Sequence, residues 1–381
     1  SRNHYVAVIG LLVAIGGGII LLRWPPLGVV AIVGSIIIPV TGPSQSNATM
    51  AVVGALLGLW LLNMMVIQRE IKLVQSRSIL PLLVFVSVAI LAFGMGQLPW
   101  YTFAPSAPLG AQLGGLAVYI LSAGAFLLVA HYLQDLRWLQ AMTWLFVLIG
   151  GLFIAGRLVP GVGVISRPLF VHSTTGSLFW TWLIAITFSQ AMFNRTLHPV
   201  WRAALAALAL ATLYEGYINN EHWKSGWVPP IFTIVAILAI RFWRISLLLS
   251  PFGFIPLSRL VSYGIAADEY SYSTRIDAWT IILEITKVNP ILGLGPSNYR
   301  WFTPLFPIRG WAVQFNSHSQ YIDLIAQTGL LGLASFVWFF SAVGWLGWHL
   351  RARVPVGFPR AYVYGALGGL VGTLIAAALG D

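Results

Sequence analysis

The sequence predicts an all-helical, polytopic membrane protein of about twelve transmembrane helices. Hydrophobic residues make up 58% of the 381-residue chain and charged residues only 8%, which is too little charge for the surface of an ordinary soluble domain. Most apolar runs approach the roughly 20 residues that a helix needs to cross the bilayer core. The runs predicted to cross are residues 5–22, 27–40, 48–67, 79–95, 109–130, 139–156, 177–193, 202–218, 228–240, 245–262, 320–350 and 361–380.

The spacing of these runs divides the chain into three regions. Residues 1–262 are expected to form transmembrane helices with short loops, residues 263–319 one large extramembrane loop, and residues 320–381 the C-terminal transmembrane helices. Because Lys and Arg favour cytoplasmic loops, the basic short connectors indicate the orientation. The cytoplasmic connectors would be those that hold Arg69, Lys72 and Arg77; Arg137; Arg195 and Arg202; Arg241 and Arg244; and Arg351, Arg353 and Arg360. The large loop then faces outward.

Seven cations would lie on the outward side, against the usual enrichment of Lys and Arg in cytoplasmic loops. They are Arg157, Arg167, Lys224, Arg275, Lys287, Arg300 and Arg309. Arginine forms bidentate, charge-assisted hydrogen bonds to phosphate oxygens, so a polyanionic ligand such as a pyrophosphate would explain the group. Anchoring of single residues to lipid headgroups is the alternative.

Within the large loop, residues 273–288 are predicted to form an amphipathic helix. Thr274 and Asp277 have the spacing of a capping box, and Ile276, Trp279 and Leu283 form an apolar stripe at helical intervals. Arg275 would then lie in the first turn, where a cation opposes the helix dipole, and this favours a functional reason for it. Residues 293–298 after the helix predict a tight, glycine-rich turn, a weak signal for a phosphate-binding loop.

A histidine precedes the long apolar segment that begins at residue 320. If this segment is helical, Gly329 lies about three turns beyond His318, and Gly332 falls on nearly the same face. The two glycines together would allow a neighbouring helix to pack closely there. Gln320 and Asp323 lie on another stripe of the same helix. A carboxylate at the membrane surface is costly unless it faces protein or water, so Asp323 should have a partner. It would orient a sugar, pair with an arginine or form a buried structural ion pair.

The composition also limits the chemistry. The chain has no cysteine and only ten acidic residues, without an Asp-x-Asp pair, so neither a thiolate nucleophile nor a divalent-metal site is predicted. We expect no cofactor and no nucleic-acid partner. A transporter is disfavoured by the lack of an internal repeat and of acidic residues within the spans. An imidazole that accepts a proton near neutral pH, together with arginines that stabilise a leaving pyrophosphate, suits transfer from a phosphate-linked donor to a hydroxyl group.

Two stretches resemble the O-antigen ligase and polymerase superfamily of bacterial envelope glycosyltransferases. His318-Ser319, nine residues and Gly329-x-x-Gly332 match its signature of a histidine followed by Asn, Ser or Gln, nine residues and Gly-x-x-Gly. Ser273-Thr274-Arg275 with Trp279, followed by residues 289–299, is similar to its loop pattern. The motifs cover about sixty residues, in the family's order.

The resemblance implies a GT-C-like bundle with a periplasmic helical loop in the bacterial inner membrane, among membrane lipids, with its active site facing the periplasm. The implied reaction is an inverting, metal-independent transfer of a glycan from undecaprenyl pyrophosphate to lipid A-core in lipopolysaccharide biosynthesis. By motif match, His318 and Arg275 would be catalytic, and Arg157 or Arg167 would supply a further arginine. Lys224 stands where many relatives have arginine, and Gln327 where many have glutamate.

The sequence leaves open which cations contact the ligand and which acceptor the enzyme would use. The residues expected to bind pyrophosphate or glycan are Arg157, Arg167, Lys224, Arg300, Arg309, Asp323 and Gln320. An O-antigen polymerase or a protein O-oligosaccharyltransferase would use the same donor with another acceptor, and no residue decides among these enzymes.

Overall fold

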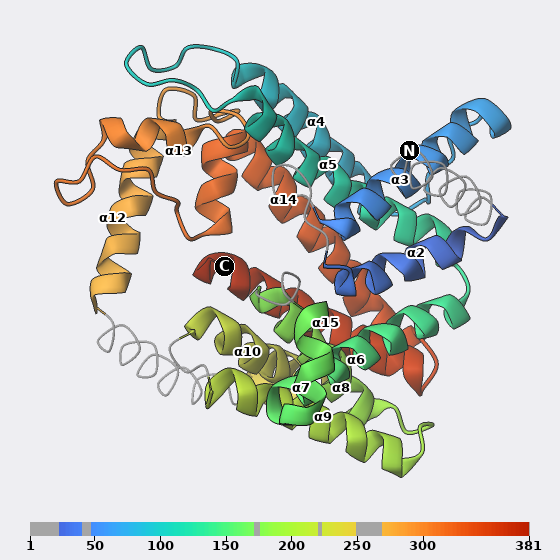
Figure 1. Ribbon diagram of the computed structural model, residues 1–381. Helices are drawn as coiled ribbons and strands as arrows, with labels where there is room; N and C mark the ends of the chain where they lie inside the picture. Colours follow the sequence, from blue (N-terminus) through green and yellow to red (C-terminus); the bar gives the residue numbers. More distant parts are fainter. Residues whose placement is uncertain (1–22, 40–46, 171–175, 220–222, 249–268, 381) are drawn as a thin grey trace, which may run out of the picture. The chain divides into compact units, whose positions relative to one another are not determined.

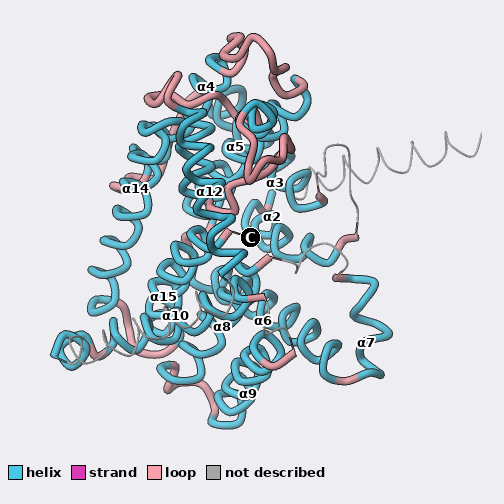
Figure 2. The backbone as a smooth tube through the Cα atoms, turned by 90° about the vertical axis from the view of Figure 1, so that its left-hand side faces the viewer, coloured by secondary structure: helices cyan, strands magenta, loops and turns pink. Residues whose placement is uncertain are grey.

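The computed structural model describes residues 23–39, 47–170, 176–219, 223–248 and 269–380 (Figure 1). Within these ranges every regular element is a helix, as Figure 2 also shows, so the predicted all-helical class is confirmed. The chain divides into two compact units, Ser1–Ser76 with Ile120–Ser173 and Arg77–Tyr119 with Thr174–Asp381. We call them the first and second units.

The described part of the first unit contains helices of very different length. Its elements are α2 (Pro25–Gly34), the 3₁₀ turn η1 (Ser35–Ile37), α3 (Ala48–Leu62), its π-helical continuation η3 (Asn63–Gln68), α6 (Leu136–Leu158), α7 (Pro160–Ser166) and the 3₁₀ turn η4 (Arg167–Leu169). Helix α5 (Leu109–Tyr132) contributes residues to both units. A buried cluster of Val29, Leu56, Trp60, Met64 and Leu128 joins α2, α3 and α5.

The second unit contains the remaining helices. They are α4 (Ile79–Met95), α8 (Ser177–Phe193), α9 (Pro199–Tyr217), α10 (Lys224–Arg241), α12 (Glu269–Thr286), α13 (Tyr299–Phe302), the 3₁₀ turn η5 (Thr303–Leu305), α14 (Gln320–Arg353) and α15 (Phe358–Leu379). Helix α4 lies beside α14 in Figure 1, and the Phe85 and Phe336 rings pack 6.4 Å apart between them.

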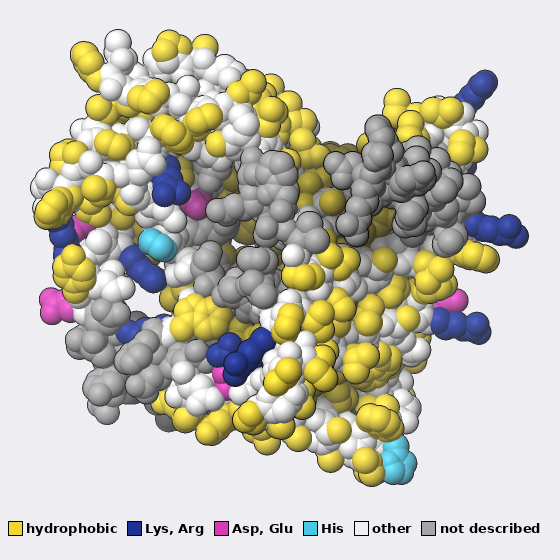
Figure 3. Space-filling model, in the orientation of Figure 1, with side chains coloured by type: hydrophobic (Ala, Val, Ile, Leu, Met, Phe, Trp, Pro, Cys, Tyr) yellow, Lys and Arg dark blue, Asp and Glu magenta, His cyan; other side chains and the backbone are white. Residues whose placement is uncertain are grey.

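Six of the described helices are long and apolar enough to cross a membrane. They are Ala48–Gln68, Leu109–Tyr132, Leu136–Leu158, Lys224–Arg241, Gln320–Arg353 and Phe358–Leu379. Hydrophobic side chains cover much of the face drawn in Figure 3. This agrees with a membrane-embedded protein, since a helix surface in contact with lipid has no need of charge.

The count of about twelve spans stays a prediction. Run 5–22 and most of run 245–262 lie outside the described residues. Run 27–40 begins as the 10-residue helix α2, which at 1.5 Å per residue extends about 15 Å, half of the bilayer core. Helices α4 and α8 are shorter apolar helices, and α9 is not among the six.

Helix α15 packs closely against two neighbours through glycines. A Cβ at Gly365 would meet the Ala185 carbonyl oxygen of α8 at 2.8 Å, and one at Gly369 would meet Trp182 at 2.9 Å. Gly368 and Gly372 approach Thr233 of α10 in the same way. Small residues four apart allow helix backbones to come together, so these glycines explain why α8, α10 and α15 form one bundle.

Helix α12 differs from its prediction in start and in buried face. It already includes Glu269, and the Thr274 hydroxyl donates to the Tyr270 carbonyl one turn earlier at 2.7 Å, so the predicted capping box is wrong. Arg275 therefore lies beyond the first turn, which removes the argument from the helix dipole. Ile276 and Leu283 are exposed, whereas the buried side chains are Ala278, Ile282, Ile285 and Thr286.

Candidate functional site

A break in α14 lies at the base of the candidate site. Gly329 has φ +68° and ψ −171°, so the helix kinks there. A Cβ at Gly329 would overlap the Ile291 carbonyl group. The prediction that this glycine accommodates a neighbouring helix is therefore wrong, because a loop occupies the space. A Cβ at Gly332 would overlap the Thr328 side chain of its own helix.

The loop that enters the break is the glycine-rich turn after α12. Its backbone exchanges hydrogen bonds with both sides of the break: Leu330 N to Pro290 O at 2.9 Å, Leu331 N to Ile291 O at 3.2 Å, Leu294 N to Ala326 O at 2.9 Å and Gly295 N to Gln327 O at 3.1 Å. Gly293 N donates to Asn289 O, and the Gln327 side chain accepts from Ser297 N at 3.1 Å. These backbone donors are occupied and residues 293–296 are buried. The turn is a structural wedge, and the phosphate-loop interpretation is wrong for it.

His318 lies in a sharp turn at the start of α14. Its φ is +50°, in the left-handed region that residues with a Cβ rarely adopt. The residue is exposed, whereas Ser317 and Ser319 on either side are buried. Ser319 is the N-cap of α14. The imidazole forms no hydrogen bond with any residue that the structure describes, so the turn presents it outward from a rigid base.

Hydrogen bonds fix that base. The Ser317 carbonyl accepts a hydrogen bond from Trp279 Nε1 at 2.6 Å, and Ser317 N donates to the Tyr299 hydroxyl at 3.3 Å. The Asp323 Oδ1 atom accepts from the Tyr299 hydroxyl at 2.6 Å and from Ser317 Oγ at 2.7 Å. Trp279 comes from α12, Tyr299 from α13 and Asp323 from α14, so three helices meet behind the histidine.

Arg275 lies one turn before Trp279 on α12 and contacts the end of α15. Its Nη1 atom donates to the Leu379 carbonyl at 2.7 Å, one of the carbonyl groups that a helix leaves unpaired at its C-terminus. The next residue, Gly380, has φ +65°, and a Cβ there would overlap the His318 carbonyl. Two consecutive residues at the end of α15 thus contact Arg275 and His318, so the two predicted catalytic residues both lie at the C-terminal end of this helix.

Lys224 belongs to the same end of the bundle. Along α15, Gly368 lies against Thr233 and Ile237 of α10, and Gly372 lies against Pro229 and Thr233. The two helices are therefore antiparallel, and the first residue of α10 is at the end of the pair where α15 finishes. The predicted cation thus lies on the Arg275 side of the second unit.

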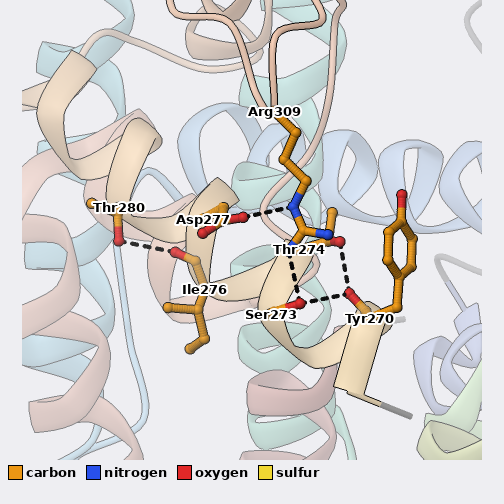
Figure 4. Close-up of polar contacts among 7 residues, drawn as sticks. All are labelled: Tyr270, Ser273, Thr274, Ile276, Asp277, Thr280 and Arg309. Carbon is orange, nitrogen blue, oxygen red and sulfur yellow. Dashed lines mark hydrogen bonds and ion pairs between the residues drawn. The ribbon is translucent and has the colours of Figure 1, made fainter.

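Arg309 lies beside α12 instead of standing free (Figure 4). Its Nε atom is 2.8 Å from Asp277 Oδ2 and its Nη2 atom donates to Ser273 Oγ at 2.7 Å. Its guanidinium also lies 4.9 Å from the centre of the Tyr270 ring. Arg309 itself has φ +51° in the tight turn closed by the Ile308 and Trp311 backbones. We call this arrangement the Arg309 clasp.

The other predicted binding residues are dispersed. Arg300 on α13 and Gln320 at the start of α14 are exposed. Arg157 lies in the last turn of α6 with its guanidinium 5.7 Å from the Phe153 ring centre, and Arg167 begins η4. Both belong to the first unit, so their part in the site stays a prediction.

The pKa values of two tyrosines, Tyr299 and Tyr101, are shifted by their surroundings. Burial and then the charge of Asp323 raise the pKa of Tyr299, which keeps its hydroxyl protonated as a donor to Asp323. Burial and then Glu284 raise the pKa of Tyr101, whose hydroxyl donates to the Ile285 carbonyl at 2.7 Å.

Sequence reasoning missed part of the site. Tyr299 ends the family-like loop pattern, but nothing in the pattern assigned it a role. Ser317 directly precedes the motif that begins at His318 but does not belong to it. Leu379 and Gly380 carry no local signal, because their contacts join residues some sixty or a hundred positions apart. Among the described residues no three His, Asp or Glu side chains are grouped as metal ligands would be.

Comparison with known proteins adds no assignment: no protein-family model matches the chain, and no curated protein matches it.

Proposed function

We propose that the chain is a membrane glycosyltransferase of the O-antigen ligase type, which moves a glycan from undecaprenyl pyrophosphate to lipid A-core. The observation that carries the proposal is an exposed His318 at the start of the candidate membrane span α14, with its backbone against Gly380 and with Arg275 bonded to the preceding Leu379. The resemblance of the surrounding motifs supplies the reaction class.

The proposed chemistry is a single displacement. The acceptor hydroxyl oxygen forms a bond to the anomeric carbon while the bond from that carbon to the phosphate oxygen breaks, and the electron pair leaves with the pyrophosphate. His318 takes the hydroxyl proton as general base. Arg275 stabilises the charge that develops on the leaving group, and Lys224 and Arg300 add positive charge. The attack from the opposite side inverts the anomeric configuration, and the resemblance implies that no metal ion is needed.

The proposed setting is the bacterial inner membrane, with about twelve spans and with residues 263–319 forming a periplasmic cap. The polyprenyl tail of the donor would stay among membrane lipids while its pyrophosphate reaches Arg275. Arg157 or Arg167 is the proposed second arginine, in keeping with the resemblance. Gln320, exposed at the start of α14, is the proposed glycan contact.

The test is an in vitro transfer assay with the full chain, undecaprenyl-pyrophosphate glycan and lipid A-core, with EDTA present. We expect the wild type to form lipopolysaccharide, and His318→Ala and Arg275→Ala to lose at least about 100-fold in rate, as expected for loss of a general base or of charge stabilisation. His349→Ala is the matched control, because His349 lies near the other end of the same helix, and it should retain activity.

Other outcomes would change the assignment. Elongation of the donor glycan would favour an O-antigen polymerase, and glycosylation of a protein would favour a protein O-oligosaccharyltransferase. If the wild type consumes no donor with any of these acceptors, the transferase proposal is wrong, and a transporter becomes the better hypothesis.

A further inference from the structure

The conformation of His318 requires support from its neighbours. A residue with a Cβ is unfavourable at φ +50°, and such a conformation persists only where surrounding contacts hold it. The His318 side chain supplies none of these contacts, since it is exposed and forms no hydrogen bond within the described ranges. The support must therefore come from the residues on either side.

Ser317 and Ser319 supply it. Ser319 N donates to Ser317 Oγ at 2.9 Å, which closes the turn around His318. Ser317 is completely buried, and its backbone is bonded on both sides, by Trp279 at the carbonyl and by Tyr299 at the amide. The orientation of the turn therefore depends on what fixes Ser317 Oγ and the Tyr299 hydroxyl.

Both of these groups meet at one carboxylate oxygen. Asp323 Oδ1 is 2.6 Å from the Tyr299 hydroxyl and 2.7 Å from Ser317 Oγ. The backbone of Asp323 also donates to the Ser319 carbonyl at 3.0 Å. In the part of the chain that the structure describes, Asp323 forms no ion pair with Lys, Arg or His, so neither predicted ion pair is present there. Oδ1 is already used by two hydroxyl groups of the protein.

We propose that Asp323 is a positioning residue for His318, which acts as a hydrogen-bond acceptor through Ser317 and Tyr299 and touches no substrate. This inference rests on the proposed function of His318 as general base. It replaces the expectation that Asp323 binds the glycan. The raised pKa of Tyr299 supports it, because a protonated hydroxyl remains a donor to Asp323 across the neutral range.

The kinetic consequence follows from the geometry of proton transfer. A general base must lie within hydrogen-bond reach of the proton that it removes, and misplacement by about 1 Å can cost about 100-fold in rate. Arg275 is held separately, by the Leu379 carbonyl. Loss of the Asp323 acceptor should therefore lower kcat while the KM for the pyrophosphate donor changes little.

The first test compares Asp323→Asn with Asp323→Leu in the full-length protein. Asparagine retains a carbonyl oxygen that accepts from both hydroxyl groups, whereas leucine fills a similar volume without an acceptor. We expect Asp323→Asn to keep kcat within about threefold and Asp323→Leu to lose at least about 30-fold in kcat, with the donor KM within about twofold in both. Tyr299→Phe should show a partial loss of the same kind. Thr280→Val is the control, because it removes a hydroxyl that bonds only the Ile276 carbonyl of α12, and it should leave kcat unchanged.

The second test needs no activity. The amides of Ser317 and Ser319 are bonded to Tyr299 and Ser317 Oγ, so hydrogen exchange of peptides that cover residues 316–320 reports on the turn. Exchange should be about tenfold faster in Asp323→Leu than in the wild type, and unchanged in Asp323→Asn.

Each outcome decides between the roles. If Asp323→Asn abolishes transfer while exchange stays unchanged, the charge of Asp323 acts directly and the positioning role is wrong. The role is also wrong if Asp323→Leu alters neither kcat nor exchange. If the wild type transfers no glycan, the proposed function fails, and the exchange comparison then still decides whether Asp323 holds the turn.

Discussion

Arg275 donates a hydrogen bond from Nη1 to the carbonyl oxygen of Leu379, 2.7 Å away and 104 residues further along the chain. The arginine thereby pairs a carbonyl group at the C-terminal end of α15, where a positive charge is favourable. One nitrogen of the guanidinium is used in this way. The bond fixes the direction of the side chain beside His318.

Substitution of Arg275 by lysine should separate charge from geometry. Lysine keeps the positive charge but lacks the planar fork that can bond Leu379 and a phosphate group together. We expect Arg275→Lys to raise the donor KM and to lose about 10-fold to 100-fold in kcat/KM, less than Arg275→Ala. Steady-state kinetics with varied donor measure this, and equal loss in both variants would mean that charge alone contributes nothing.

Gly329→Ala should disrupt the junction between α14 and the loop after α12. An alanine would need the same positive φ with an extended ψ, a region almost restricted to glycine that costs about 1–3 kcal/mol, and its Cβ would overlap the Ile291 carbonyl. We expect the free energy of unfolding to fall by more than about 2 kcal/mol, measured by thermal denaturation in detergent. Gly94→Ala in α4 is the control, because a Cβ there meets nothing within 4 Å, and its stability should be unchanged or slightly higher.

Gly380→Ala should affect the site more than the fold. Its Cβ would overlap the His318 carbonyl, yet the residue lies past the end of α15. We expect at least about a 10-fold loss of transfer rate, because the turn around His318 must shift, with a melting temperature close to that of the wild type. Full activity in Gly380→Ala would contradict a functional role for the contact between Gly380 and His318.

The Arg309 clasp should be structural. Because two guanidinium nitrogens bond Asp277 and Ser273, we expect Arg309→Gln and Asp277→Asn to leave the donor KM within about twofold, and the double variant to be no worse than either single one. Donor titration of the three variants measures this. A donor KM raised by Arg309→Gln alone would instead support the prediction from sequence that Arg309 binds the donor.

Alkaline pH should destabilise the cap through Tyr299. Its pKa is raised in the folded protein, so the contribution of Tyr299 is fully present below the unfolded pKa of about 10. Above that pH the unfolded chain ionises first, and stability should fall by about 1.4 kcal/mol per pH unit until the folded pKa is reached. Thermal melts between pH 9 and pH 11 should therefore show a shallower decline in Tyr299→Phe than in the wild type. Thr280→Val should follow the wild-type slope.

The structure contains the predicted helices, with nearly the predicted bounds, where a long apolar run by itself determines the helix. Runs 48–67, 79–95, 109–130 and 177–193 match α3 with η3, α4, α5 and α8 closely, because a long apolar segment must satisfy its own backbone hydrogen bonds. The start of α12 and its buried face were predicted wrongly. Thr274 and Asp277 fit a capping box by spacing, but the packing of Ile282 and Ile285 against Leu294, Tyr299, Phe302 and Ala326 decided which side is buried.

The sequence by itself determined that the protein is helical and membrane-embedded, and it identified His318 and Arg275 through their neighbouring motifs. Only the tertiary structure decided that Gly329 breaks α14, that the loop after α12 fills the break, and that Leu379 and Gly380 join the two residues. The physical reason is the distance along the chain between the interacting residues. Hydrophobicity and helix formation depend on neighbours along the chain, whereas a left-handed glycine or a shared carboxylate depends on backbone and side chains that arrive from distant segments.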